Sequence, residues 1–134
     1  MIGYVTLGTN DLARAEAFVL AVLGLMGAQK LFPMPQGGSI WGRSMDEPLL
    51  AMCPPFDGKP ATAGNGTMVA LMAANRAEVD AVHARAMAAG GSDEGAPGLR
   101  DAEAVPDDDP MAFYGAYFRD PDGNKFCAFH LGPG

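Results

Sequence analysis

The chain has 134 residues, of which 49% are hydrophobic and 19% are charged. This length and composition predict one soluble globular domain and exclude a disordered or fibrous segment. Nine lysines and arginines stand against sixteen acidic residues, so the net charge is −7. Because the cations are also scattered singly, nucleic acid and anionic membrane surfaces are excluded as expected partners.

The cysteines and the apolar stretches indicate the cellular compartment of the protein. Cys53 and Cys127 form no Cys-x-x-Cys pair and are too few for a disulfide framework, so we expect free thiols in a reducing compartment. The longest apolar stretch, residues 15–26, is far shorter than a bilayer span. The N-terminus shows no positive region followed by an apolar one, as a signal peptide would. We therefore expect a cytoplasmic protein.

The first half of the chain predicts a strand, a helix and further short strands. Residues 2–7 have the pattern of a strand, Asn10 is expected to cap a helix, and residues 12–23 have helical spacing up to Gly24. The further strands are predicted at residues 28–32, 39–43 and 49–53.

The second half repeats this order. Residues 67–72 predict a strand, and Asn75 predicts a helix cap with Glu78 at the capping-box position. The helix is predicted at residues 79–89, where Gly90 follows its last residue. The two expected caps lie about half the chain length apart, which indicates an internal duplication. We place the two modules at residues 1–63 and 64–134.

The end of the second module is predicted to be a hairpin. Strands are expected at residues 113–119 and 125–131, because the sequence Asp-Pro-Asp-Gly-Asn at 120–124 favours a tight turn between them. The segment 92–110 is rich in acids, glycine and proline, and it predicts a solvated loop.

Four segments carry a more specific pattern. They are Val5-Thr6-Leu7-Gly8 followed by Asn10-Asp11-Leu12, Gly64-Asn65-Gly66-Thr67, Gly95-Ala96-Pro97-Gly98-Leu99-Arg100, and Tyr114-Gly115-Ala116-Tyr117-Phe118 leading into residues 119–125. Together they resemble the vicinal oxygen chelate superfamily, which includes glyoxalase I, bleomycin-resistance proteins and extradiol dioxygenases. The resemblance covers nearly the whole chain. It implies an α+β fold of two βαβββ modules, whose mixed curved sheets form a partly open barrel around a ligand cavity that is often completed in a homodimer.

The resemblance and the alternation of side chains along strands together predict which residues line the cavity. We expect Thr6 and Ala70 on the cavity face, and Phe126, Ala128 and His130 on the helix face. The substrate-binding residues expected from this arrangement are Tyr4, Trp41, Met52, Met68, Met72, Tyr114, Cys127 and Phe129.

Enzymes of this superfamily bind a divalent metal at positions that match Tyr4, Met68 and Cys127, with Met52 or a neighbour as the fourth. A phenol and a thioether are poor ligands for the metals that the family uses, which favour imidazole and carboxylate. His83 is expected in the middle of the second helix and His130 near the end of the last strand, and we expect both to make ordinary hydrogen bonds. The sequence therefore predicts neither a metal site nor a cofactor.

Two functions remain open. The first is a protein that resembles the bleomycin-resistance branch and binds an apolar or aromatic small molecule without a metal, as a homodimer. The second is a divergent lyase or dioxygenase-type enzyme that uses Tyr4 or Cys127. A further interpretation is that the methionines and Cys127 simply fill the cavity as core. For Cys127, no basic residue is evident nearby, so an inert buried thiol is favoured over a nucleophile.

Overall fold

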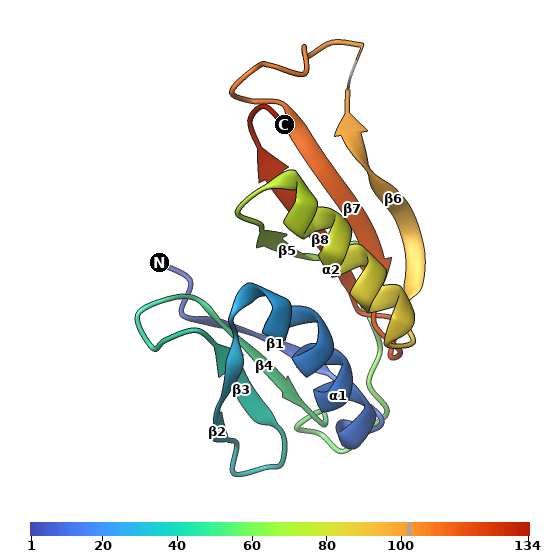
Figure 1. Cartoon of the computed structure of the whole chain (residues 1–134). Helices are drawn as coiled ribbons and strands as arrows, with labels where there is room; N and C mark the ends of the chain where they lie inside the picture. Colours follow the sequence, from blue (N-terminus) through green and yellow to red (C-terminus); the bar gives the residue numbers. More distant parts are fainter. Residues whose placement is uncertain (102) are drawn as a thin grey trace.

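The computed structural model, which describes residues 1–101 and 103–134, contains the two expected βαβββ modules (Figure 1). The first module consists of β1 (Tyr4–Gly8), α1 (Leu12–Leu23), the short 3-10 helix η1 (Gly24–Met26), β2 (Gln29–Pro33), β3 (Ser39–Gly42) and β4 (Leu49–Cys53). The second consists of β5 (Val69–Met72), α2 (Arg76–Ala88), β6 (Ser92–Arg100), β7 (Phe113–Arg119) and β8 (Lys125–Leu131). The predicted α+β class is confirmed.

Each module has its own mixed sheet. The strand order is β1-β4-β3-β2 in the first sheet and β5-β8-β7-β6 in the second. The first strand of each module pairs in parallel with the last strand, while the other pairs are antiparallel. The two sheets do not close into a barrel, so β1 and β5 are both edge strands.

The starts of the two helices differ from each other. The expected cap at Asn75 is confirmed, because its Oδ1 accepts a hydrogen bond from the Glu78 amide at 2.9 Å. The expected cap at Asn10 is wrong. Asp11 caps α1 by accepting from the Arg14 amide, and the Asn10 side chain instead exchanges two hydrogen bonds with the backbone of Ala61 in the linker between the modules.

The composition of the segment 92–110 predicts a loop throughout, but this prediction is wrong for its first part. Its first part forms β6, which pairs with β7 at the edge of the second sheet and has register shifts around Gly95. An edge position tolerates Pro97, since one side of an edge strand donates no ladder hydrogen bond. The glycines and the proline remove the alternating pattern that would predict a strand, although the backbone still pairs with β7.

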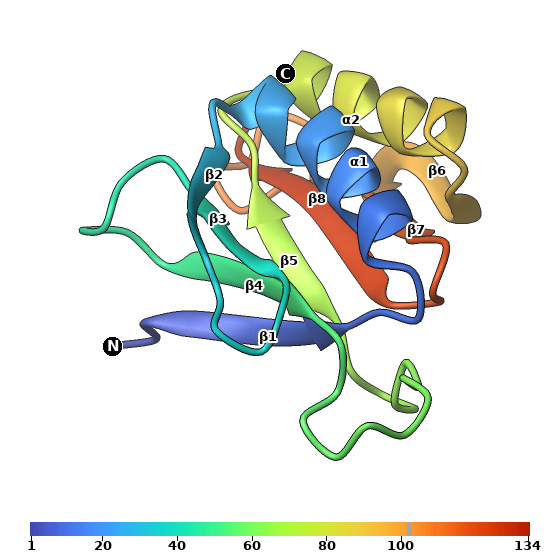
Figure 2. The same ribbon diagram turned by 90° about the horizontal axis from the view of Figure 1, so that it is seen from below.

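One hydrophobic core joins the two modules. The helices α1 and α2 lie side by side over the sheets (Figure 2). Phe18 of α1 reaches the second sheet, where its ring lies 6.3 Å from Phe118 and 6.5 Å from Phe126. Both helices therefore occupy the same side of the molecule, and no described helix covers the opposite face of either sheet. We call these opposite faces the open faces.

None of the described helices is long and apolar enough to cross a membrane.

Candidate functional site

The open face of the first sheet carries Tyr4 and Thr6 on β1. Both side chains are exposed, and they line a cavity of about 470 Å³ together with Cys53 and Phe56. The strand alternation in β1 explains this placement, because Val5 and Leu7 turn to the opposite side and pack in the core. Tyr4 therefore lies on the face that the sequence predicts for it.

The open face of the second sheet carries three exposed residues: Ala70 and Met72 of β5, and Met68 directly before it. In the parallel register with β8, Ala70 pairs with Cys127 and Met72 pairs with Phe129. Paired residues project from the same face of a sheet. These five residues therefore lie on one face of the sheet, as expected, although Cys127 itself is buried.

Four further residues on this open face were missed in the sequence analysis: Arg100, Phe113, Tyr117 and Lys125. Phe113 stacks on Phe129 with ring centroids 5.1 Å apart and an interplanar angle of 6°. Tyr117 pairs with Cys127 in the register of β7 and β8. The alternation in residues 113–119 carried this signal, since Phe113 and Tyr117 have the same parity and Tyr114 the other.

Tyr114, Met52 and Trp41 do not lie on the open faces, where the sequence analysis placed them, but on the helix side of their sheets. Tyr114 packs against the core, and its hydroxyl donates to Asp80 of α2 at 2.8 Å. Met52 is fully buried in the same core, and Trp41 also belongs to it. These residues belong to β7, β4 and β3, in which both faces are apolar. The pattern of hydrophobic residues therefore did not show which face turns to the helices.

A hydrogen-bonded chain holds Trp41 in this orientation. Its indole Nε1 donates to the Ser39 hydroxyl at 2.9 Å, and that hydroxyl donates to Glu16 of α1. Lys30 also donates to Glu16, at 2.9 Å. The hydrogen bond from Ser39, assisted by Lys30, lowers the pKa of Glu16 below its ordinary value. Trp41 is therefore fixed to the helix side by a polar network as well as by packing.

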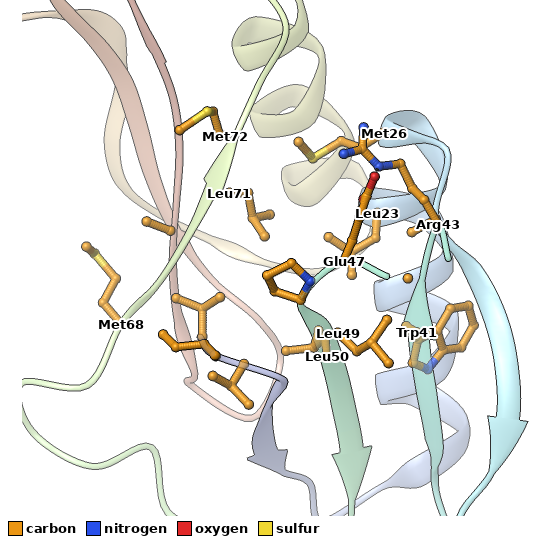
Figure 3. A pocket seen from close by; sticks show the side chains of 17 residues that line it. Leu23, Met26, Trp41, Arg43, Glu47, Leu49, Leu50, Met68, Leu71 and Met72 are labelled. Atoms are coloured by element: carbon orange, nitrogen blue, oxygen red, sulfur yellow. Dashed lines mark hydrogen bonds and ion pairs between the residues drawn. The ribbon is translucent and has the colours of Figure 1, made fainter. Parts of the chain in front are cut away.

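Trp41 nevertheless lines a second cavity, a cleft between the modules of about 520 Å³ (Figure 3). Leu23, Leu50 and Leu71 contribute apolar side chains to its wall, and Arg43 and Glu47 form an ion pair at 2.7 Å beside it. In Figure 3, Met68 and Met72 extend from the other side of β5 than Leu71 does. Met68, Ala70 and Met72 nevertheless also line the cleft, so it borders the open face of the second sheet along β5.

Cys127 lies in a charged environment that the sequence did not reveal. Burial raises the pKa of the Cys127 thiol, while Tyr117, Arg100 and Lys125 act in the opposite direction. The expectation that no basic residue lies nearby is therefore wrong. Because burial is the largest effect, the thiol stays protonated at neutral pH, as an inert buried cysteine does.

The four residues that the resemblance matched to metal positions, Tyr4, Met52, Met68 and Cys127, offer neither imidazole nor carboxylate donors. Met52 points into the core, away from the open face that carries Tyr4. The raised pKa of Cys127 disfavours the thiolate that a metal requires. Within residues 1–101 and 103–134, no three His, Cys, Asp or Glu side chains come together. The phenol of Tyr4 and the thioether of Met68 add only weak donors.

The histidines make ordinary hydrogen bonds, as expected. His83 Nε2 lies 2.9 Å from Asp93 Oδ1, and His130 Nδ1 lies 3.2 Å from the Ala73 carbonyl oxygen.

The filled-core interpretation holds for only part of the set. Met52 and Cys127 are buried, but Met68 and Met72 are not, with 44% and 69% of their surface exposed. The methionines of β5 therefore do not fill a collapsed core within one chain.

Comparisons with known proteins agree with this architecture. A family model of the Glyoxalase/Bleomycin resistance protein/Dioxygenase superfamily matches residues 1–128. The chain is similar to the crystal structure of a glyoxalase/bleomycin resistance protein from Albidiferax ferrireducens T118, with 34% identity, a TM-score of 0.83, and coverage of 97% of this chain and 98% of that one. No curated protein matches the sequence.

Two more distant structures share the fold alone. A glyoxalase-related enzyme from Fulvimarina pelagi is 20% identical, with a TM-score of 0.72 and coverage of 97% of this chain and 87% of that one. A lactoylglutathione lyase from Agrobacterium tumefaciens is 23% identical, with a TM-score of 0.61 and coverage of 97% and 92% respectively.

Proposed function

Because the chain belongs to the Glyoxalase/Bleomycin resistance protein/Dioxygenase superfamily, we propose that it binds an apolar or aromatic small molecule on its open faces, without a metal. The observation that carries this proposal is the exposure of large apolar side chains there: Tyr4 is 60% exposed, Met68 44% and Met72 69%. Exposed apolar patches on single domains mark interaction sites. Methionine in particular adapts its shape to different ligands.

The alternative is a divergent lyase or dioxygenase-type enzyme, and the geometry favours it less. Such an enzyme would need Cys127 as a thiolate or Tyr4 as a proton donor beside a substrate. Burial keeps the Cys127 thiol protonated. Tyr4 makes no side-chain hydrogen bond with another described residue that would orient its hydroxyl. The geometry of Tyr4 and Cys127 therefore supports binding better than catalysis.

The binding proposal predicts a specific effect of Met72. N-phenyl-1-naphthylamine, a neutral aromatic dye whose fluorescence rises in apolar surroundings, serves as the probe. We expect Met72→Gln to weaken its binding by about fivefold to tenfold, because an amide replaces a thioether in the apolar contact. The affinity is measured by fluorescence titration, with and without EDTA, and the chelator is expected to leave it unchanged.

Met111→Gln is the matched control, because Met111 is 67% exposed but lies in the loop before β7. It should leave the affinity for the dye unaltered. Equal affinities for the Met72→Gln and Met111→Gln variants, or no binding by the unaltered protein, would contradict the proposal.

We also propose that two copies of the chain associate so that their open faces are partly enclosed and become paired ligand cavities. One chain leaves Tyr4, Met68 and Met72 in water, which is unfavourable for apolar groups of this size. Sedimentation equilibrium is expected to give twice the mass of the 13.9 kDa chain. A monomer at micromolar concentration would show that the faces stay uncovered.

A further inference from the structure

Two cations flank one aromatic ring on the open face of the second sheet. The Arg100 guanidinium carbon lies 5.1 Å from the centre of the Tyr117 ring, and Lys125 Nζ lies 5.6 Å from the same centre. Arg100 comes from β6 and Lys125 from β8, on either side of β7, which carries Tyr117. The sheet topology therefore brings the two charges together, although 24 residues lie between them in the sequence.

The Arg100 guanidinium is fixed in place but not neutralised. Its Nη2 donates to the carbonyl oxygens of Ala96 at 2.7 Å and Gly115 at 2.9 Å. Its Nε is buried and has no hydrogen-bond partner in the part of the chain that the structure describes. A partly buried cation held by carbonyl groups and an aromatic ring retains its charge, and an anion would compensate it.

The surrounding acidic groups do not pair with Arg100: Asp93, whose pKa is lowered mainly by the hydrogen bond to His83, is affected by Arg100 only from a distance. Five other basic side chains form ion pairs with carboxylates: Arg14, Lys30, Arg43, Arg76 and Arg119. Among the described residues neither Arg100 nor Lys125 has a carboxylate within ion-pair distance. The nearby acids are engaged elsewhere, Asp93 with His83 and Glu94 with Arg119.

The same face offers an aromatic platform beside the cations. Phe113 is the register partner of Arg100, and its ring stacks on Phe129. Met72 adjoins Phe129 in the register of β5 and β8. An aromatic ring of a ligand can lie against these side chains, while an acidic substituent of that ligand reaches the guanidinium.

We propose that the open face of the second sheet takes a small aromatic molecule that carries an anionic group, and that Arg100 binds this group. The inference rests on the proposed function and deepens it, since it names the class of ligand. Arg100 sets the preference for an anion, Lys125 adds to the positive potential, and Phe113 with Phe129 holds the ring. The chain has a net charge of −7, so most of its surface repels anions. A local cationic site would therefore direct an anionic ligand to this face.

Two dyes that share an aromatic frame test this inference. 1-Anilinonaphthalene-8-sulfonate has the frame of N-phenyl-1-naphthylamine and adds a sulfonate. We expect Arg100→Gln to weaken binding of the sulfonate dye by about tenfold, as the loss of a charge-assisted hydrogen bond does, and to leave the neutral dye within about twofold. Arg100→Lys should keep part of the affinity, because it retains the charge but not the planar donor pair.

Arg85→Gln is the control, because Arg85 is exposed on α2 and its replacement removes the same charge from outside the face. It should alter neither affinity. Raising the salt concentration should weaken binding of the sulfonate dye to the unaltered protein more than to Arg100→Gln. The melting temperature of each variant is measured to confirm that it is folded.

The outcomes separate the two proposals. If the unaltered protein binds the neutral dye but Arg100→Gln leaves the sulfonate dye unaffected, the anion site is refuted and the proposed function stands. An equal loss for both dyes in a folded Arg100→Gln variant also refutes it, because the role of Arg100 would then be structural. If the protein binds neither dye, both proposals fail together.

Discussion

Phe118→Ala is expected to lower the free energy of unfolding by about 4 kcal/mol, the usual cost of truncating a buried phenylalanine. Phe118 is fully buried. Its ring stacks on Phe126 with centroids 5.5 Å apart, and it lies 6.3 Å from Phe18 of the other module. The substitution thus leaves a cavity where α1, α2 and the second sheet meet. Urea unfolding, followed by the fluorescence of Trp41, gives the measurement.

Phe56→Ala is the control for this prediction. Phe56 is 97% exposed in the linker after β4, so its replacement should change the unfolding free energy by less than about 0.5 kcal/mol. Phe118→Leu, which keeps much of the volume, should fall between the two. If Phe118→Ala cost no more than Phe56→Ala, the two modules would not share a core.

The shared core explains how far the sequence predicts the fold. Local signals suffice for α1, β4, β7 and β8, whose predicted bounds match the structure. The turn residues and helical spacing that mark them depend on neighbours in sequence. β6 was missed because an edge strand with register shifts needs few of the residues that typify strands. Its pairing with β7 supplies what its own composition lacks.

The candidate site shows the same division. The open-face positions of Tyr4 and Met72 follow from alternation, since one face of β1 and β5 is exposed and the other is buried or half-buried. The side of Cys127 in β8 was assigned from the family resemblance, because burial does not alternate along that strand. In β3 and β4 every residue is buried, so alternation of polarity disappears and the sides of Trp41 and Met52 were assigned wrongly. Arg100 was missed for a different reason: its partner ring, Tyr117, is a neighbour only through the β6–β7 pairing.

Asp122→Ala is expected to lower the free energy of unfolding by about 3 kcal/mol, because it removes two hydrogen bonds to a carboxylate that join the modules. Asp122 lies in the β7–β8 turn, and its side chain is 2% exposed. It accepts hydrogen bonds from the Thr9 hydroxyl at 2.6 Å and from the Asn10 amide at 2.9 Å, both between β1 and α1. The turn of the second module is thereby fastened to the first.

The expected loss comes from the hydrogen bonds to Thr9 and Asn10 rather than from the ion pair that Asp122 makes with Arg14. Arg14 is half exposed, so Arg14→Ala should cost less than about 1 kcal/mol. Asp108→Ala removes the same negative charge from an exposed loop position and should have almost no effect. Thermal unfolding of the three variants compares them, and equal losses for Asp122→Ala and Arg14→Ala would refute the explanation by the hydrogen bonds to Thr9 and Asn10.

The same substitution bears on ligand binding. Asn124 of this turn donates to the Gly8 carbonyl oxygen at 3.0 Å, so the turn holds the end of β1 as well as the start of α1. The strand β8 that follows carries Lys125, Cys127 and Phe129 on the open face. Asp122→Ala should therefore loosen the placement of this face relative to β1. We expect the folded variant to bind both naphthyl dyes more weakly, whereas Arg100→Gln affects only the sulfonate dye.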